Sequence, residues 1–371
     1  MMQKRPIFSL VILLFACGGP TPGQAASYTL TITANHGSVT VTPERAQYDE
    51  GETVELIPRP EVGYCFSHWS GDLRGNRLVG RVTMDSNKSI TANFKTWTPP
   101  IGIPVPEFGI FETYRMYDDP ASRNPELTYH QNAEGGYFTH YIDNSDPNST
   151  DSGNAYGSVA KPRKTIPSTL PPGSVVEIHN SINETGTRYK VIAGNETWPV
   201  FVRGAGPNDL PNIAASFVIK GPYTIWENLR IQGGVQIRPH DGSNAHHVCV
   251  RACELWNTGE VGAAAGVAIY GATENRFHNV VVYGNHIHHG GDSEAEPEND
   301  SHGINVGIQT QDVWVVDNHI HHMGGDSFQA AHNANFTTYR MYVGRNVMYD
   351  DRENAVDVKQ ANHVIVSQNE M

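Results

Sequence analysis

The chain has 371 residues, of which 36 are glycine and 23 are proline, while only 18% are charged. This composition is typical of a turn-rich β protein, and it excludes a helical bundle and a disordered chain. The formal net charge of -13 excludes binding to nucleic acid through a general basic surface, so we expect no nucleic-acid partner.

Residues 1–26 have the pattern of an export signal. Two basic residues precede an apolar run over residues 7–16, which is too short to span a bilayer as a mature helix. Residues 14–18 resemble a bacterial lipobox, in which Cys17 would become the lipidated N-terminus, whereas the small residues 23–25 suit ordinary signal peptidase. We favour the lipoprotein, because Cys17 lies directly at the end of the apolar run. The sequence therefore predicts an exported protein, either an outer or cell-surface lipoprotein or a secreted one, that meets a membrane only through an N-terminal lipid anchor.

Residues 27–95 are predicted to form a small all-β module. Apolar and polar residues alternate over residues 28–33, as in a half-buried strand, and turn residues separate further short strands. We expect these further strands at residues 39–41, 53–57, 81–84 and 90–94. The segments 63–72 and 84–94 resemble the divergent internalin B-type repeat of bacterial surface proteins. The resemblance implies a β-grasp-like spacer or adhesion module rather than an active site, with Trp69 packed in its core.

Residues 96–140 connect this module to the rest of the chain. Residues 96–106 contain several prolines, which favour extended polyproline geometry and therefore a semi-rigid linker. We expect residues 107–140 to form a capping or docking segment.

From about residue 223 onward a short unit of the form apolar-x-apolar-x-x-Asn-x-apolar recurs. Its Asn position falls at Asn228, Cys253, Asn285, Asn318, Asn346 and Asn369. Successive copies are between 23 and 33 residues apart, which suits one turn of a β-solenoid with loops of variable length. Alternate apolar residues would point into the coil, and the asparagines would stack into a structural ladder of amides. The repeat therefore predicts a right-handed parallel β-helix over residues 141–371, with further coils expected beyond its C-terminal end.

A second strand can be aligned in each coil, at residues 266–269, 303–306, 327–330 and 355–358. Its outward positions are Ala268, Asn305, Gln329 and Asp357, with Lys359 two residues further on. The fold resembles that of the pectate-lyase-like β-helix superfamily, whose enzymes place their binding groove on an outward strand face. This resemblance implies that Asn305 and Gln329 bind substrate.

Two consecutive copies of the unit continue with the nearly identical sequence Asn-His-Ile-His-His. If the coils stack in register, His286 lies near His319, and His288 lies near His321. Three interpretations stay open for this region: stacked turn residues with no further role, a calcium site, and a transition-metal site made of imidazoles.

Of the two metals we prefer calcium (Ca²⁺), because the carboxylate of a polysaccharide can complete its shell of oxygen ligands. Three carboxylates near the His-rich turns are expected to bind it, namely Glu298, Asp300 and Asp326. Residues 350–359 resemble the DGxxDI strand of pectate-lyase-like proteins, in which an acidic residue binds calcium. That resemblance adds Asp357 to the expected ligands.

The expected partner is an acidic polysaccharide, and the expected reaction is β-elimination at a uronate. Elimination needs a base that removes the proton α to the carboxylate, and a cation that neutralises the carboxylate. Lys359 is the candidate base, and Arg352 or Arg345 would bind the carboxylate, beside Ca²⁺. The alternative for Lys359 is an ion pair with Asp357 or Glu353 on a solvated surface.

Two other classes of function stay open. A non-catalytic surface adhesin or carbohydrate-binding protein would need only the export signal and the repeats. A glycoside hydrolase would need two carboxylates at a defined separation in one groove. If the protein is an enzyme we favour the polysaccharide lyase, which requires Lys359, Arg352 and an acidic pair to converge on one outward face.

Overall fold

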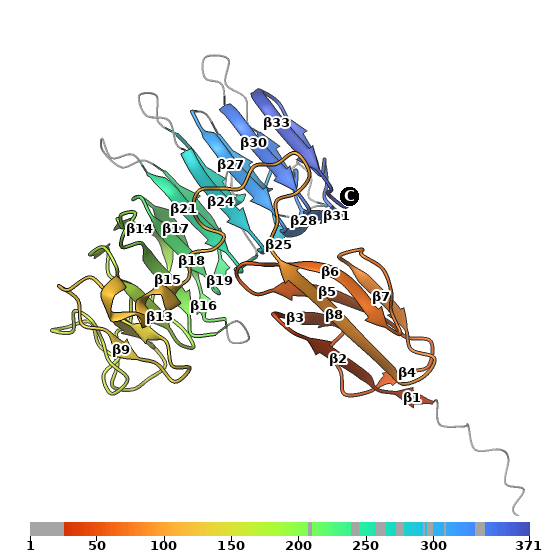
Figure 1. The fold of residues 1–371 in the computed structure, drawn as a ribbon, viewed down its shortest axis with the longest axis horizontal. Coiled ribbons are helices and arrows are strands. Elements are labelled where there is room, and N and C mark those ends of the chain that lie inside the picture. The colour runs from red at the N-terminus through yellow and green to blue at the C-terminus, as the bar shows by residue number, and fades with distance from the viewer. Residues whose placement is uncertain are drawn as a thin grey trace, which may run out of the picture.

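The computed structural model describes residues 26–206, 210–238, 245–256, 265–271, 278–291, 294, 300–307, 309–330 and 338–371. These residues form an N-terminal β module, a long solenoid of parallel strands and a segment that joins the two (Figure 1). These described residues are all-β apart from two short 3-10 helices, which confirms the predicted fold class. Within the described ranges, no helix is long and apolar enough to cross a bilayer.

The N-terminal module packs two small sheets and a short strand pair around one core. Its strands are β1 (Ser27–Tyr28), β2 (Leu30–Ala34), β3 (Gly37–Thr42), β4 (Tyr48–Asp49), β5 (Thr53–Pro60), β6 (Tyr64–Gly71), β7 (Gly80–Thr83) and β8 (Lys88–Thr96). The sheet orders are β2-β8-β6 and β3-β5-β7, with β1 paired to β4. Burial alternates along β2 as predicted. Trp69 is buried and its indole donates to the Arg77 carbonyl (2.9 Å), which confirms that it packs in the core.

The solenoid has three sheets in which every pair of neighbouring strands is parallel. The nine-stranded sheet contains β11 (His140–Ile142), β13 (Val175–Ile178), β15 (Val200–Gly204), β18 (Thr224–Glu227), β21 (His246–Arg251), β24 (His278–Tyr283), β27 (Gln311–Val316), β30 (Thr338–Gly344) and β33 (Ala361–Ser367). The eight-stranded sheet contains β12 (Thr169–Leu170), β14 (Gly186–Ile192), β17 (Ala215–Ile219), β20 (Val235–Ile237), β23 (Ala265–Ile269), β26 (His302–Val306), β29 (Phe328–Ala330) and β32 (Val356–Val358). The six-stranded sheet contains β16 (Asn212–Ile213), β19 (Arg230–Gln232), β22 (Glu254–Trp256), β25 (His286–Gly290), β28 (His319–Met323) and β31 (Val347–Tyr349). This is the right-handed parallel β-helix that the repeat predicts.

The interior of the solenoid is one apolar core to which all three sheets contribute. Alternate residues of each strand point inward, and those of successive coils stack, as Ile287 does on Ile320. Each fully buried aliphatic side chain stabilises the fold by roughly 1.5–3 kcal/mol relative to exposure. The opposite residues of each strand face outward and are free to carry chemistry.

The asparagine ladder lies at the corner between the nine-stranded and six-stranded sheets. The Asn285 amide donates to Asn318 Oδ1 (3.0 Å), Asn318 donates to Asn346 (3.0 Å), and Asn346 donates to Asn369 (2.9 Å). Each amide also donates to a backbone carbonyl, such as that of Val250 from Asn285 (2.9 Å). The ladder thus satisfies backbone groups that a buried corner would otherwise leave unpaired, which confirms its structural role.

The joining segment runs across the outer face of the nine-stranded sheet and buries it (Figure 1). Trp97 donates to Asp317 Oδ2 (2.8 Å), and the Trp314 indole donates to the Pro104 carbonyl (2.8 Å). Further along, Arg251 donates to the Gly109 carbonyl (2.8 Å). The 3-10 helices η1 (Tyr114–Asp118) and η2 (Pro120–Ser122) and the pair β9 (His130–Gln131) and β10 (Tyr137–Phe138) then follow. The nine-stranded face is therefore occupied by the chain itself.

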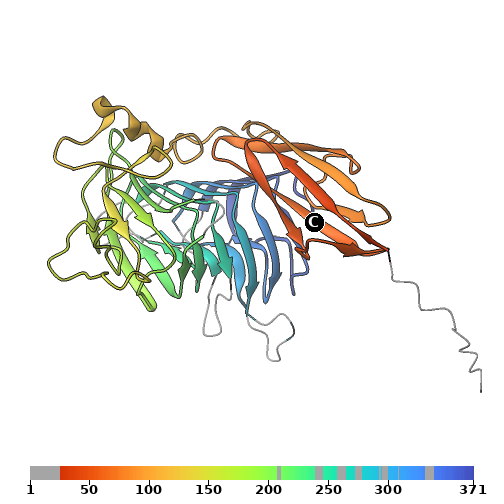
Figure 2. The same cartoon turned by 90° about the horizontal axis from the view of Figure 1, so that it is seen from below.

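The N-terminal module and residues 107–140 lie at opposite ends of the solenoid. Figure 2 shows the orange module beside the blue late coils, and the yellow segment beside the green early coils. The Tyr283 hydroxyl donates to the Tyr64 carbonyl, which joins β24 to the start of β6. Of the three outer faces, the eight-stranded and six-stranded faces of the late coils carry the residues of functional interest.

Candidate functional site

The outward row predicted along the eight-stranded sheet is present in the structure. Asn305 on β26, Gln329 on β29 and Asp357 on β32 pair in register on three successive strands. The Asn305 amide donates to Gln329 Oε1 (3.2 Å), and both side chains are buried. Lys359 follows β32, and its Nζ lies 3.5 Å from Asp357 Oδ2, the ion pair expected as the alternative to catalysis. The row offers amides, a carboxylate and an amine along a line parallel to the solenoid axis.

His302, at the start of β26, connects this row to the acidic residues. Its Nδ1 accepts a hydrogen bond from the backbone N–H of Asp326 (3.1 Å), and its Nε2 lies 3.1 Å from Asp300 Oδ1. Because Nδ1 accepts, Nε2 carries the proton of the neutral ring and donates it to Asp300. Burial lowers the pKa of His302 although Asp300 and Asp326 oppose this. The sequence offered one signal for this residue, a histidine placed directly before an outward strand.

Asp326 is enclosed by hydrogen-bond donors. Its Oδ1 accepts from the backbone N–H (3.0 Å) and the amide (2.9 Å) of Asn354, and its Oδ2 accepts from the Gln329 amide (2.9 Å). The side chain is fully buried. Both oxygens are thus used within the fold, and the predicted role of Asp326 as a calcium ligand does not fit. Glu298 lies outside the described residues, which leaves Asp300 and Asp357 as described carboxylates for such a site.

Asp351, on the turn between β31 and β32, is a carboxyl group that the sequence pattern did not single out. Its Oδ1 accepts from the Met323 N–H (3.0 Å), and the Ser327 hydroxyl donates to its other oxygen. Burial raises the pKa of Asp351 to about 7 against the effect of these hydrogen bonds, and Asp326 and Asp350 raise it further. A carboxyl group that exchanges a proton near neutral pH thus lies beside the outward row.

The two predicted arginines occupy different places. Arg345, after β30, binds both oxygens of Asp317 (2.7 and 2.8 Å) and the Thr98 carbonyl (2.6 Å). It therefore anchors the joining segment on the nine-stranded face, contrary to its predicted part in substrate binding. Arg352 lies on the turn that holds Asp351, where its backbone N–H donates to the Met323 carbonyl (3.0 Å).

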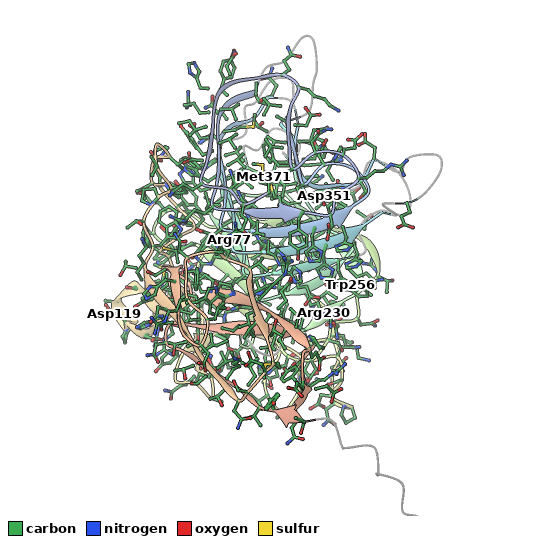
Figure 3. All side chains as sticks on the ribbon, turned by 90° about the vertical axis from the view of Figure 1, so that its right-hand side faces the viewer. Arg77, Asp119, Arg230, Trp256, Asp351 and Met371 are labelled. Carbon is green, nitrogen blue, oxygen red and sulfur yellow. The ribbon has the colours of Figure 1, made fainter. Side chains whose placement is uncertain are left out.

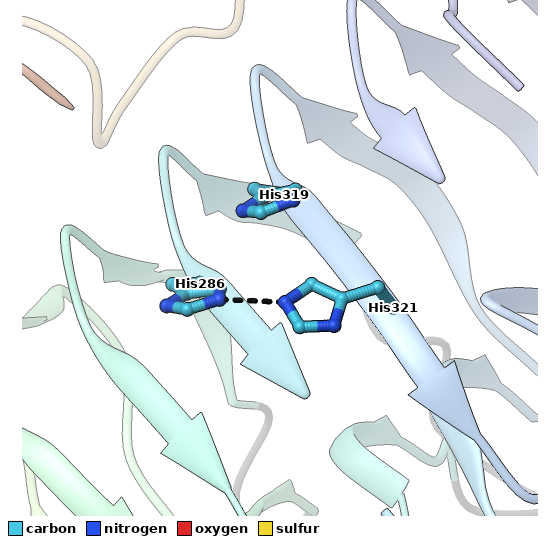
Figure 4. A group of neighbouring side chains, drawn as sticks. All are labelled: His286, His319 and His321. Atoms are coloured by element: carbon cyan, nitrogen blue, oxygen red, sulfur yellow. Dashed lines mark hydrogen bonds between the residues drawn. The ribbon is translucent and has the colours of Figure 1, made fainter. Parts of the chain in front are cut away.

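The outer face of the six-stranded sheet carries the stacked histidines. His286 pairs with His319 and His288 with His321 in the register of β25 and β28, which confirms the predicted stacking. The first pair of rings is 4.8 Å apart with planes 6° from parallel, and the second is 5.4 Å apart at 9°. His286 Nε2 and His321 Nε2 face each other at 2.9 Å (Figure 4).

Other side chains continue this histidine array on both sides. Towards the N-terminus, Glu254 Oε1 lies 3.3 Å from His288 Nε2 and 3.2 Å from Arg230 Nε. The Arg230 guanidinium lies 5.5 Å from the Trp256 ring, and both residues are labelled in Figure 3. Towards the C-terminus, the Tyr349 hydroxyl lies 3.0 Å from His319 Nε2. The array with these neighbours thus extends over five successive strands of this sheet, β19, β22, β25, β28 and β31.

Burial holds three histidines of this face, His286, His319 and His321, in the neutral form. Burial lowers the pKa of His286 and His319 well below its usual range, and lowers that of His321 to about 3. Arg59, on β5 of the N-terminal module, lowers all three further by charge repulsion. Burial lowers the pKa of Arg59 itself to about 10. A neutral imidazole is the form that binds metal ions.

Residues 28–98 match the model of the divergent InlB B-repeat domain, which confirms the resemblance found in the N-terminal module. The match covers the module and does not extend into the solenoid. No curated protein sequence matches this chain.

Several solved structures of carbohydrate-active enzymes are similar to this chain at low identity. An alginate lyase from Paenibacillus sp. str. FPU-7 is 14% identical with a TM-score of 0.33, and the match covers 54% of this chain and 91% of that one. A GH136 lacto-N-biosidase from Eubacterium ramulus is 12% identical with a TM-score of 0.34, over 62% of this chain and 67% of that one. The catalytic domain of a GH87 alpha-1,3-glucanase is 14% identical with a TM-score of 0.27, over 82% of this chain and 60% of that one. These likenesses concern the fold, and no functional residue is carried over from them.

Proposed function

We propose that this protein acts on an acidic polysaccharide at the outer face of the eight-stranded sheet, by β-elimination at a uronate. The row of Asn305, Gln329 and Asp357 that leads to Lys359 supports the proposal most directly. Neighbouring strands are about 4.8 Å apart, so the row presents polar groups at regular intervals along the axis. An extended polymer with repeated hydroxyl and carboxylate groups suits such a row, as the resemblance to the pectate-lyase-like superfamily implies.

Each side chain has a part in the proposed reaction. Lys359, in its amine form, removes the proton α to the carboxylate, and Asn305 and Gln329 bind sugar hydroxyls. The electrons of that C–H bond form the double bond of the unsaturated uronate as the glycosidic bond from the β carbon to oxygen breaks, and the leaving oxygen takes a proton from water. Arg352 neutralises the carboxylate as negative charge develops on it. Lys359 Nζ lies 3.5 Å from Asp357 Oδ2, so in the proposed reaction the ammonium must leave this ion pair and lose its proton before it can serve as the base.

Calcium is the cation that this reaction was expected to use. The described carboxylates fit it poorly, because Asp326 spends both oxygens on Asn354 and Gln329. We therefore derive no step through calcium, and its requirement is a separate arm of the test below.

A glycoside hydrolase is the second candidate, and Asp351 favours it. Hydrolysis needs one carboxyl group that stays protonated near neutral pH to serve as the acid. Asp351 has that property because its burial raises its pKa to about 7. The non-catalytic adhesin is the remaining alternative.

Export completes the proposal. We propose that residues 1–26 direct secretion and that Cys17, which lies outside the described residues, carries the lipid anchor. The protein would then act as an outer or cell-surface lipoprotein, or as a secreted one if cleavage follows residue 25.

The test is to incubate the full chain with alginate, pectate and glycosaminoglycans and to follow the ultraviolet absorbance of unsaturated uronates. We expect absorbance to rise on at least one polymer, and Lys359→Ala to abolish the rise. Lys161→Ala is the matched control, because Lys161 is an exposed lysine near the N-terminal end of the solenoid.

Three results separate the alternatives in this assay. Absorbance that is unchanged on every polymer contradicts elimination. New reducing ends without absorbance would indicate the hydrolase, and retention of polymer without cleavage would indicate the adhesin. Parallel reactions with added Ca²⁺ and with EDTA show whether the reaction needs calcium.

A further inference from the structure

The histidine array on the six-stranded sheet has no part in the proposed reaction, yet its chemistry is well defined. We propose that this face binds one divalent transition-metal ion of the Zn²⁺ class through His286, His319 and His321. The three side chains come from neighbouring strands, β25 and β28, and point outward because Ile287 and Ile320 between them point into the core (Figure 4). The inference is independent of whether the eight-stranded face is catalytic.

The spacing of the ligand atoms fits a metal ion. One side-chain nitrogen from each of His286, His319 and His321 can be chosen so that all lie within 4.8 Å of one another. Zn²⁺ binds imidazole nitrogen at about 2.0–2.1 Å, so tetrahedral geometry places two ligand atoms about 3.3 Å apart. The 2.9 Å between His286 Nε2 and His321 Nε2 is slightly shorter than this distance. Small side-chain rotations therefore suffice to form the site.

A second group of possible ligand atoms shares His286 with the first. Glu254, His286 and His288 also place one ligand atom each within 4.8 Å of one another. His286 belongs to both triads, so an ion bound there has an imidazole or a carboxylate on either side. Zn²⁺ accepts both imidazole nitrogen and carboxylate oxygen as ligands.

The hydrogen bonds of the array leave an imidazole nitrogen without a partner among the described residues, and this nitrogen could bind a metal ion. His319 Nδ1 is buried and has no hydrogen-bond partner among the described residues, although the ring is only 4% exposed. Buried polar atoms are nearly always paired, so an orphan of this kind is a place to expect an ion or a water molecule. In addition, the contact of His286 with His321 joins two nitrogens, of which one neutral ring must donate and the other accept. A metal ion would accept the lone pairs of both rings.

The charges that face the array limit the affinity without excluding the ion. Arg59 of the module repels a cation, as its effect on the pKa of His286 and His319 shows. The negative charge of Glu254 opposes this repulsion. Burial raises the pKa of Glu254, but the hydrogen bond from His288 and the charge of Arg230 together lower it by more, so its pKa lies below the ordinary value. Imidazole ligands select borderline ions such as Zn²⁺, Ni²⁺ and Cu²⁺ over Ca²⁺ and Mg²⁺. The ligand set therefore assigns a transition metal to this face, whereas oxygen ligands prevail on the eight-stranded face.

The test uses the full chain without a histidine tag, stripped with EDTA and dialysed. Zn²⁺ is titrated against a chromogenic chelator, and Co²⁺ is added separately so that its visible absorption bands report the ligand geometry. We expect one equivalent of Zn²⁺ to bind, and Co²⁺ bands of a four-coordinate nitrogen site. The double variant His286→Gln, His321→Gln should weaken Zn²⁺ binding at least about tenfold and remove the Co²⁺ bands.

His130→Gln is the matched control, because His130 is an exposed histidine on β9, far from this face. It should leave both the stoichiometry and the Co²⁺ spectrum unchanged. Circular dichroism of the double variant establishes that it folds, and the single variant His321→Gln replaces it if it does not. Failure of the unmodified chain to bind one equivalent, or binding that the array variants leave intact, would overturn the proposal.

Discussion

The outward faces of the eight-stranded and six-stranded sheets in the late coils share one backbone register and differ in how their polar groups are satisfied. On the eight-stranded face, Asp326 is surrounded by donors from Gln329 and Asn354, so different side chains complement one another. On the six-stranded face, like is stacked on like, as His286 on His319. Rings stacked face to face do not point the N–H of one ring at the acceptor nitrogen of the other, and His319 Nδ1 has no hydrogen-bond partner among the described residues. Identical repeats thus leave unused ligand capacity, whereas diverged repeats can form closed hydrogen-bond networks.

The largest expected effect tests the hydrogen bonds that Asp326 accepts from Gln329 and Asn354. Asp326→Ala should lower the free energy of unfolding by about 3 kcal/mol, because it leaves the Gln329 amide and two Asn354 donors without their acceptor. Urea denaturation measures the change. Asp300→Ala, at an exposed carboxylate, should stay within about 0.5 kcal/mol. Equal effects of the two variants would show that Asp326 is not the centre of this network.

The next effect tests the stacked histidines through the loss of folding stability at acid pH. The pKa of His321 is about 3 when folded against an ordinary 6.5, so below pH 6.5 the unfolded chain binds a proton that the folded chain does not. Stability is therefore present above pH 6.5 and is lost as the pH falls, by about 2 kcal/mol at pH 5. The groups that lower this pKa after burial are His288, His322, His289 and Arg59.

His321→Gln should remove most of this loss between pH 7 and pH 5, measured by urea denaturation in EDTA. His130→Gln is again the control, and it should keep the full acid lability of the unmodified chain. If the acid lability of His321→Gln were also unchanged, His321 would titrate as an ordinary solvated histidine.

Sequence alone could predict the parts of this structure that depend on periodicity. The spacing of the Asn units determines the coil, and alternation then places Asn305, Gln329 and Asp357 in one row. The histidine stacking was predictable for the same reason, since the two copies are nearly identical. Periodicity does not reveal which other segment of the chain contacts an outward residue.

Arg345 and Asp326 illustrate that limit. Alternation places Arg345 outside the coil, but its partner Thr98 is 247 residues away, in the joining segment. Asp326 has the chemistry of a calcium ligand, yet it is saturated by Asn354 from the following coil, at a separation that variable loops obscure. His302 was missed because its contact with Asp300 depends on the loop before β26. Each error concerns contacts between segments, which local pattern does not encode.

The eight-stranded face should show the opposite pH dependence. The pKa of Asp351 is about 7 when folded against an ordinary 3.8, so between these values the folded chain binds the extra proton. Stability from this group is present at acid pH and falls as the pH rises through 7. Asp351→Asn should remove that fall, about 1.4 kcal/mol between pH 6 and pH 8. Asp146→Asn, in an exposed turn, serves as control, and a wild-type slope in Asp351→Asn would contradict the raised pKa.

The smallest expected effect concerns Arg59, which joins the module to the histidine face. Arg59→Gln keeps a polar side chain near Thr40 but removes the charge that disfavours cations at His286 and His319. We expect Zn²⁺ to bind a few times more tightly, since removing one repulsive charge near the site changes the binding free energy by on the order of 1 kcal/mol. The same variant should also reduce the stability that the protein loses between pH 7 and pH 5. Arg45→Gln, which disrupts a pair with Glu52 elsewhere in the module, should change neither quantity. If Arg59→Gln and Arg45→Gln behaved alike, the module would not tune this face, and the low histidine pKa would follow from burial alone.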